Sequence, residues 1–317
     1  MNVWQFISNK QSFSVNVILL YVLQSEGSSP GRQGFKMAVS SDGDFFGSIG
    51  GGIMEHKFVE MAKAKLQSSI AAADIYKQVH DKIVKKNQSG MICSGEQVIF
   101  LYQIQQKDIT HVFALINSLS HNQNGSLQLT KKGISFSCDV PATNYYLELS
   151  EDDFLLVEKT GYKNQLHIIG GGHCALAFSK LMYGMDFLIH LYEEREGLNT
   201  MEQNHFVHNK IIIKSYTSLD TLISGGENVY VVIMTFGYRS DDEALRALLG
   251  KKFKYIGMLG SKKKVEKIFS EYRAENINDA ALQNLHSPIG IQVKSQTPEE
   301  IAISIAAEII AIKNHDQ

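Results

Sequence analysis

The residues best suited to hold a phosphate-bearing ligand lie in the stretch 166–194. A short apolar run leads into GGGHCA at 170–175, which fits G-x-G-x-x-A, and a second apolar run ends about 20 residues on with two glutamates. The first glycine permits a tight strand-to-helix turn, the third lets backbone N–H groups approach a pyrophosphate, and the helix N-terminus favours phosphate. A carboxylate at the end of the second run can hold a ribose diol. We expect these cofactor-binding residues: Gly170, Gly171, Gly172, His173 and Glu193.

A second glycine-rich turn lies near the N-terminus. Gly50, Gly51 and Gly52 follow a β-like run and precede a helical pattern with Glu55 in its first turn. Three glycines in a row are costly to order, so close approach of a ligand or of another backbone explains them better than a plain turn. Glu55 is favourable near a helix N-terminus by itself, which leaves its role open.

The loop GSSPGRQG at 27–34 carries hydroxyl groups and one guanidinium, that of Arg32. It could wrap an anion through backbone donors and Arg32. Composition alone favours the alternative, a surface loop that only turns.

Cys93 lies in GMICSG at 90–95, among small residues just before a β-like run. As a thiolate it could contact molybdenum, or another soft metal, or sulfur. The alternative is a small buried hydrophobic residue. Cys138 and Cys174 fall in regular patterns and are predicted to be structural. The sequence has no H-E-x-x-H, P-loop lysine or nucleophile elbow, so we assign no catalytic residue.

Composition sets limits on the class of protein. The chain has 317 residues, 44% of them hydrophobic and 20% charged, with a net charge of −2. This balance excludes an electrostatic nucleic-acid binder and is ordinary for a soluble two-domain protein. The first ten residues lack a signal-peptide pattern, and no apolar stretch is long enough for a bilayer. Three cysteines without C-x-x-C spacing fit a reducing cytoplasm.

The order of predicted elements indicates an α/β protein of two domains. Residues 1–160 contain short β-like runs with a few helices, which predicts a smaller α+β domain. Residues 161–317 alternate strand and helix, which predicts a Rossmann-like doubly wound parallel sheet with right-handed crossovers. Its last helix is marked by TPEE at 297–300, with an N-cap, a proline at the first position and a capping-box glutamate.

Taken together, these segments resemble the XdhC/CoxI family, the accessory proteins of xanthine dehydrogenase and related molybdenum hydroxylases. The matching pieces run nearly end to end: GSSPGRQGFKM (27–37), DGDFFGSIGGGIME (42–55), MICSGEQVIF (91–100), LHIIGGGHCALAF (166–178), LYEER (191–195), VVIMTFGYRSDDEAL (231–245), YIGMLGSKKK (255–264) and HSPIGIQVKSQTPEEIAISIAAEIIA (286–311). The sequence departs from the family pattern at Ile53, Ser94 and Phe236, where the family often has Cys, Gly and His.

The resemblance implies a cytoplasmic chaperone without turnover. Such a protein binds molybdenum cofactor, as molybdopterin or a dinucleotide form, and delivers it after sulfuration to an apo molybdenum hydroxylase. A cysteine desulfurase is the second implied partner, and a homodimer stays open. The alternative from another class is an NAD(P)-dependent oxidoreductase, which the fingerprint at Gly170–Gly172 supports but for which no proton-transfer group is evident. A scaffold with a vestigial nucleotide site is the third hypothesis.

Overall fold

The computed structural model describes residues 1–68, 71–79, 95–151, 153–275, 282 and 284–315. It divides into two compact units, Met1–Gly161 and Tyr162–Gln317, which are described separately. Cys93 lies outside the described residues.

The N-terminal unit contains a five-stranded antiparallel sheet of order β3-β2-β1-β5-β4. Its central strand alternates between two cores, as a strand buried on both faces must. The odd-numbered residues from Val17 to Leu23 face one core, which includes Trp4 of α1, and the even-numbered residues from Ile18 to Val22 face the other, which includes α2. The elements are α1 (Val3–Ser12), β1 (Val17–Gly27), β2 (Lys36–Ser40), β3 (Phe45–Gly47), α2 (Gly52–Leu66), β4 (Ala73–Val79) and β5 (Gly95–Gln103).

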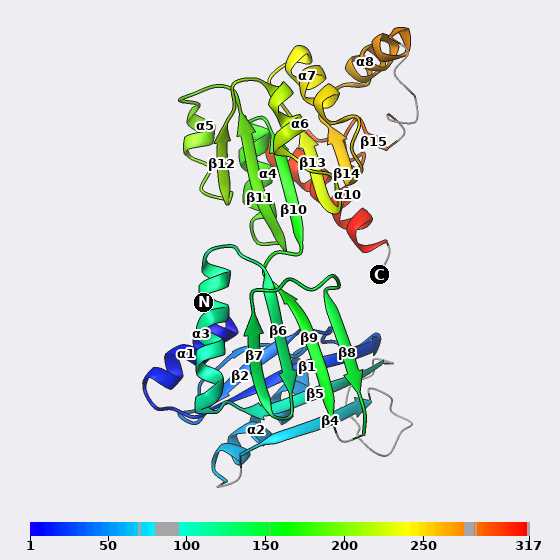
Figure 1. Ribbon diagram of the computed structural model, residues 1–317. Coiled ribbons are helices and arrows are strands. Elements are labelled where there is room, and N and C mark those ends of the chain that lie inside the picture. The colour runs from blue at the N-terminus through cyan, green and yellow to red at the C-terminus, as the bar shows by residue number, and fades with distance from the viewer. Residues whose placement is uncertain (69–70, 80–94, 152, 276–281, 283, 316–317) are drawn as a thin grey trace. The chain divides into compact units, whose positions relative to one another are not determined.

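A second antiparallel sheet, of order β7-β6-β9-β8, completes this unit. Leu127 and Leu129 of β6 and Leu156 of β9 share the first core with β1 and β5, and the strands of the two sheets cross in Figure 1. The elements here are η1 (Gln106–Asp108), α3 (Ile109–Ser120), β6 (Gly125–Thr130), β7 (Gly133–Ser137), β8 (Tyr145–Leu149) and β9 (Phe154–Thr160).

The C-terminal unit is built on a six-stranded parallel sheet of order β12-β11-β10-β13-β14-β15, which confirms the predicted Rossmann-like architecture. The chain starts at β10 in the middle, moves outward to β12, and returns to β13 on the other side of β10. The carboxyl ends of β10 and β13 therefore flank the point where the strand order reverses, which is where doubly wound folds bind ligands. The strands are β10 (Asn164–Ile169), β11 (Phe187–Glu193), β12 (Asn209–Ile212), β13 (Gly226–Ile233), β14 (Phe253–Met258) and β15 (Leu285–His286).

Helices cover both faces of this sheet (Figure 1). Leu166 and Ile168 of β10 share a core with α4 and α10, whereas Ile169 belongs to a core with α6, α7 and α8. The predicted capping box is confirmed, because the Thr297 hydroxyl accepts from the Glu300 amide at the start of α10. The helices are α4 (His173–Met182), α5 (Asn199–Glu202), η2 (Tyr216–Ser218), α6 (Leu219–Leu222), α7 (Tyr238–Leu248), α8 (Lys262–Ala274) and α10 (Pro298–Asn314). None of the helices in the described ranges is both long and apolar enough to span a membrane.

Candidate functional site

The glycine turn after β10 is shaped by its contact with the next strand of the sheet. Gly170 has φ +108°, and a Cβ atom there would lie 2.4 Å from the Met234 carbonyl oxygen. Only glycine fits this position without displacing the backbone that follows β13. The turn is therefore pinned beside Thr235, whose Cα would lie 2.8 Å from the same added atom.

The end of the turn is open. Gly172, the N-cap of α4, has φ −74°, and apart from its own chain neighbours no described atom lies within 4 Å of where its Cβ would be. Within the described residues no side chain caps this helix, although Ser261 caps α8 and Thr297 caps α10. His173 is exposed at the first position, while Ala175 is buried against the core. The first N–H groups of α4 are thus available for an anion.

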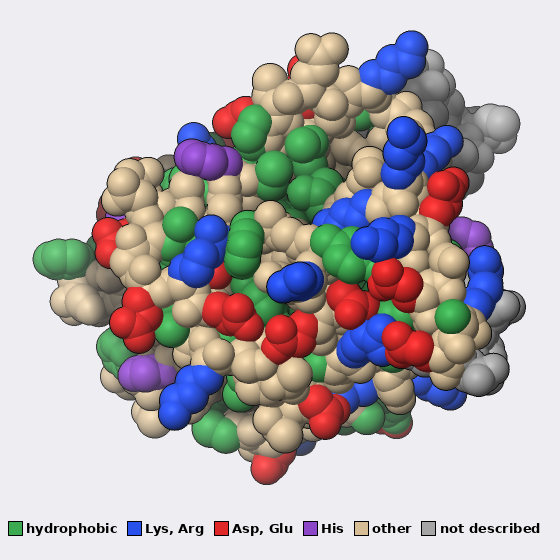
Figure 2. Space-filling model, turned by 90° about the horizontal axis from the view of Figure 1, so that it is seen from above, with side chains coloured by type: hydrophobic (Ala, Val, Ile, Leu, Met, Phe, Trp, Pro, Cys, Tyr) green, Lys and Arg blue, Asp and Glu red, His purple; other side chains and the backbone are tan. Residues whose placement is uncertain are grey.

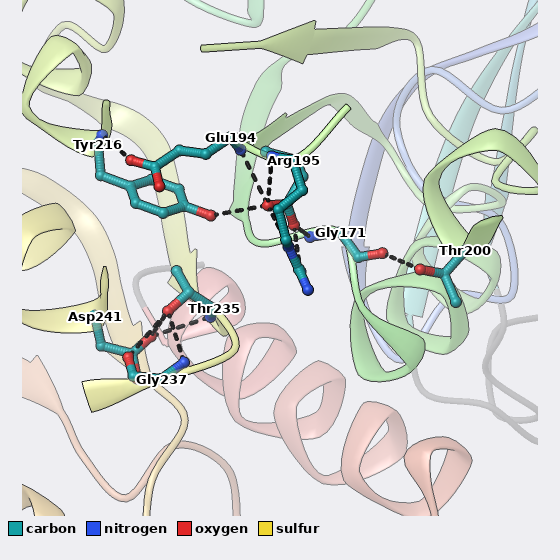
Figure 3. A network of polar contacts seen from close by, with 9 residues as sticks. Gly171, Glu194, Arg195, Thr200, Tyr216, Thr235, Gly237 and Asp241 are labelled. Atoms are coloured by element: carbon teal, nitrogen blue, oxygen red, sulfur yellow. Dashed lines mark hydrogen bonds and ion pairs between the residues drawn. The ribbon is translucent and has the colours of Figure 1, made fainter. Parts of the chain in front are cut away.

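Glu193, at the end of β11, lies beside the turn, and its carboxylate already has protein donors. Two of the residues that supply them, Gly171 and Arg195, are labelled in Figure 3. One oxygen accepts from the Gly171 amide at 2.7 Å, and the other accepts from the Glu194 and Arg195 amides. The Arg195 guanidinium donates to both oxygens, at 2.9 and 2.8 Å. Burial alone would raise the pKa of Glu193, but these hydrogen bonds outweigh it and lower the pKa to about 2.

The hydrogen bonds of Glu193 bear on the prediction that its carboxylate holds a ribose diol. A carboxylate that holds a ribose diol must have free acceptor positions, whereas this one is fully buried and hydrogen-bonded. Its direct role in the structure is to fix the Gly171 amide, and the Thr200 hydroxyl fixes the Gly171 carbonyl from the other side at 2.5 Å. Ribose binding by Glu193 stays a prediction that requires Arg195 to move.

Arg195 also contacts an aromatic ring. Its guanidinium carbon lies 4.7 Å from the centroid of the Phe236 ring, which follows β13 and is 67% exposed. Two strand ends on either side of β10 thus supply a cation and a ring that lie against each other. The sequence separates these residues by 41 positions, so neither was identified as part of a site from the sequence.

A buried acid anchors the loop after β13. The Asp241 carboxylate is fully buried and accepts from the Thr235 amide at 3.0 Å and from the Thr235 hydroxyl at 2.6 Å (Figure 3). Its second oxygen forms an ion pair with Lys264, which also donates to the Leu259 carbonyl after β14. This pair ties two loops at the carboxyl edge of the sheet. Sequence reasoning missed both residues.

The end of the C-terminal unit that carries α7 and α8 is seen from above in Figure 2. Green hydrophobic side chains gather among tan atoms on this side of the molecule, and blue lysine and arginine side chains lie next to them (Figure 2).

In the N-terminal unit the structure brings the two glycine-rich loops together. The buried Gln97 side chain donates to the Gly31 carbonyl at 3.0 Å and to the Ile49 carbonyl at 3.2 Å. A Cβ atom at Gly50 would lie 2.6 Å from the Gly31 amide nitrogen. Close approach of another backbone therefore accounts for Gly50, whereas apart from its chain neighbours no described atom lies within 4 Å of a Cβ at Gly51.

Glu55 and Arg32 both bond to the backbone of this region. The Glu55 carboxylate accepts from the Ser48 hydroxyl at 2.6 Å and from the amides of Ile49 and Gly51 at 3.0 Å. Exposed Arg32 donates to the Gly27 carbonyl at 3.0 Å. Glu55 thus holds the turn in shape, and cofactor binding by Arg32, Glu55 and the glycines stays a prediction.

The predicted metal contact, Cys93, cannot be placed because it lies outside the described residues. Gly95, at the start of β5, packs against the backbone of the 27–34 loop, with the Ser29 amide 2.7 Å from an added Cβ. Within the described ranges, no three His, Cys, Asp or Glu side chains form a group that could hold a metal ion. Cys138 is exposed and Cys174 is partly buried, both without a disulfide.

Comparisons with known proteins agree with this architecture. The chain is 23% identical to an uncharacterized protein of Escherichia coli strain K12, YqeB, over 99% of this chain and 47% of that protein. It is 32% identical over 79 residues to a Bacillus subtilis protein named as a probable xanthine dehydrogenase subunit, covering 25% of this chain and 22% of that protein. The chain therefore spans about half, or less, of the length of these curated relatives.

A solved structure described as a xanthine dehydrogenase from Bacillus halodurans has the same fold, with a TM-score of 0.72 at 21% identity, over 100% of this chain and 97% of that one. Residues 166–309 match the model of the XdhC Rossmann domain, and residues 14–73 match the model of the XdhC and CoxI family. The two models cover more than half of the sequence and parts of both units. The chain belongs to the XdhC and CoxI family.

Proposed function

We propose that this protein is an accessory chaperone of a xanthine dehydrogenase-type molybdenum hydroxylase. It binds the molybdenum cofactor and delivers it, after sulfuration, to the apo-hydroxylase. Membership of the XdhC and CoxI family supports this role, as does the similarity to a probable component of xanthine dehydrogenase. A cysteine desulfurase is the second partner in this proposal.

The observation that carries the proposal is the open glycine turn at Gly170–Gly172. Gly172 leaves room for a ligand atom where a side chain would stand, and the N-terminus of α4 has no side-chain cap among the described residues. The cofactor's phosphate fits such a donor set. Gly171 is held on both sides by Glu193 and Thr200, so the donors are fixed before the ligand arrives.

The cofactor supplies molybdenum and its dithiolene to the hydroxylase, so the chaperone has only to hold and protect it. In the proposal the glycine turn and His173 hold the phosphate end. Further cofactor contacts are proposed in the N-terminal unit, at Gly50–Gly52, Arg32 and Cys93. A thiolate is a softer donor than a hydroxyl for molybdenum or for a persulfide sulfur.

The test is a matched pair of glycine variants, purified from molybdenum-replete cells. Gly172→Val places a side chain at the open end of the turn. Gly184→Val places one after α4, where likewise no described atom other than those of the chain neighbours lies within 4 Å of the added Cβ. Bound molybdenum and pterin, and activation of an apo-hydroxylase, should fall in Gly172→Val and persist in Gly184→Val. A folded Gly172→Val protein that retains both would refute the phosphate site.

A thiol substitution tests the proposed role of Cys93. Cys93→Ser should keep the fold, retain less cofactor and fail to activate the client, whereas Cys138→Ser, at an exposed position, should behave as the parent. Equal cofactor retention and client activation by Cys93→Ser and the parent would remove Cys93 from the proposal.

An NAD(P)-dependent oxidoreductase is the alternative function, and the state of Glu193 weighs against its NAD form. In that form the acid after the second strand would hold the ribose diol, but here it is bonded to Arg195 and Gly171. Oxidation of NADH or NADPH by the purified protein at a rate proportional to its concentration would favour the alternative.

A further inference from the structure

We infer that Phe236 and Arg195 form a stacking surface for the planar heteroaromatic ring of the ligand, beside the glycine turn that holds its phosphate. The inference rests on the proposed function only in placing the phosphate at Gly170–Gly172. It adds the two residues that contact the ring of such a ligand, a phosphorylated nitrogen heterocycle such as a pterin or a nucleobase.

The first observation is the exposure of Phe236. Its ring is 67% exposed, although a large aromatic side chain gains most from burial. It lies three residues beyond the end of β13, next to the point where the strand order of the sheet reverses. An apolar ring left uncovered at this edge, where doubly wound sheets bind ligands, offers a face to a ligand.

The second observation is how firmly Arg195 is held against that ring. Its guanidinium carbon lies 4.7 Å from the ring centroid, and its Nε and one terminal nitrogen bond to the buried Glu193 carboxylate. Two hydrogen bonds fix the plane of the guanidinium, so no freedom has to be lost when a ligand stacks. The side chain is still 39% exposed.

The charge of the pair decides what it can recognise. Glu193 has a pKa of about 2, set by burial and by the opposing hydrogen bonds from Arg195 and Gly171, and is therefore ionised at neutral pH. Its charge offsets that of Arg195. The surface therefore offers a planar contact and the remaining N–H donors of Arg195 more than a net positive charge.

The surface lies next to the phosphate donors on two sides. Glu193, which holds Arg195, accepts from the Gly171 amide at 2.7 Å. Thr235, which precedes Phe236, is the residue whose Cα would meet a Cβ at Gly170 at 2.8 Å. A ligand with a phosphate on the turn can therefore place its ring on Phe236 and Arg195.

Calorimetric titration of the full chain tests this with three probes: inorganic pyrophosphate, ADP and dihydroneopterin triphosphate. Pyrophosphate tests binding at the glycine turn alone, whereas the other two probes also carry a nucleobase or a pterin ring. Phe236→Ala should weaken binding of the ring-bearing probe that the parent binds best by about tenfold, the usual scale of base stacking, and leave the affinity for pyrophosphate within about twofold. Phe236→Trp should retain the affinity, and Phe113→Ala, at an exposed ring of the other unit, should change nothing.

Because Glu193 is engaged, 2′-deoxy-ADP should bind within about twofold of ADP. Unchanged affinity of Phe236→Ala for both ring-bearing probes would overturn the inference, as would ring-bearing probes that bind the parent no better than pyrophosphate does. In either case pyrophosphate binding that is lost in Gly172→Val would leave the proposed phosphate site standing. A parent protein that binds none of the probes would overturn both.

Discussion

Replacing Glu193 by Gln should destabilise the C-terminal unit by about 3 kcal/mol at neutral pH. The carboxylate is fully buried, and its pKa is about 2 against an ordinary value of 4.5. Each unit of that shift is worth about 1.4 kcal/mol of preference for the ionised form. Glutamine keeps the shape of the side chain, but it removes the charge and turns an N–H₂ group toward one set of donors.

The sign of the pH dependence follows from the lowered pKa. The contribution of the ionised Glu193 is complete above pH 4.5, the unfolded value, and is lost as the pH falls toward 2. The difference in free energy of unfolding between the parent and Glu193→Gln should therefore decrease from about 3 kcal/mol at pH 7 to roughly half of that at pH 3.

The assay must report the unfolding of each unit separately. Trp4, the one tryptophan in the sequence, belongs to the N-terminal core, so its fluorescence reports that unit during urea unfolding. Hydrogen exchange in β10 and β11 reports the C-terminal unit. Glu196→Gln, an exposed acid three residues on, is the matched control.

The reasoning fails if Glu193→Gln and Glu196→Gln exchange alike in β10 and β11 at neutral pH. It also fails if Glu193→Gln lowers the stability of the C-terminal unit by the same amount at pH 3 as at pH 7, because the destabilisation would then not depend on the charge of Glu193. A change in the Trp4 transition of the same size would show that the effect is not confined to the unit that contains Glu193.

Three further predictions concern positions away from that carboxylate. Burial lowers the pKa of His167 to about 3, so the unfolded state binds a proton more readily as the pH falls below 6.5. The free energy of unfolding measured in urea should therefore fall by about 2 kcal/mol between pH 6.5 and 5, and His167→Phe should reduce this pH dependence. Gly170→Ala should unfold the C-terminal unit at lower temperature than Gly172→Ala in calorimetry, because only the former has a positive φ and a backbone oxygen in the way. Tyr21→Phe should cost about 1–2 kcal/mol in urea unfolding, since the buried hydroxyl donates to Glu158 at 2.7 Å.

Much of the C-terminal unit could be predicted because local patterns and the final contacts agree there. The alternation of strands and helices is read directly from the sequence, and the Thr297 capping box is completed within four residues. The helix α1 was not predicted, although Asn2 and Gln5 form a capping box, because its mixed polarity resembles a loop. The short edge strand β15 has two residues and no pattern to detect.

The glycine turn could be predicted, but the surroundings of Glu193 could not. The spacing of G-x-G-x-x-A places an acid near the turn, as the structure shows. The sequence pattern does not predict that Arg195 donates hydrogen bonds to the Glu193 carboxylate, or that Phe236, which follows another strand, lies against Arg195. Such partners depend on which strands become neighbours, and therefore on the order of the sheet.

Because their hydrophobic clusters are separate, the two halves of the chain can change independently in evolution. The two clusters of the N-terminal unit lie wholly before Gly161, and the two of the C-terminal unit lie wholly after it. Neither half shares these cores with the other, so selection can alter, exchange or extend one half at little thermodynamic cost to its neighbour. Substitutions can then accumulate in the N-terminal loops while the glycine turn at Gly170–Gly172 is kept.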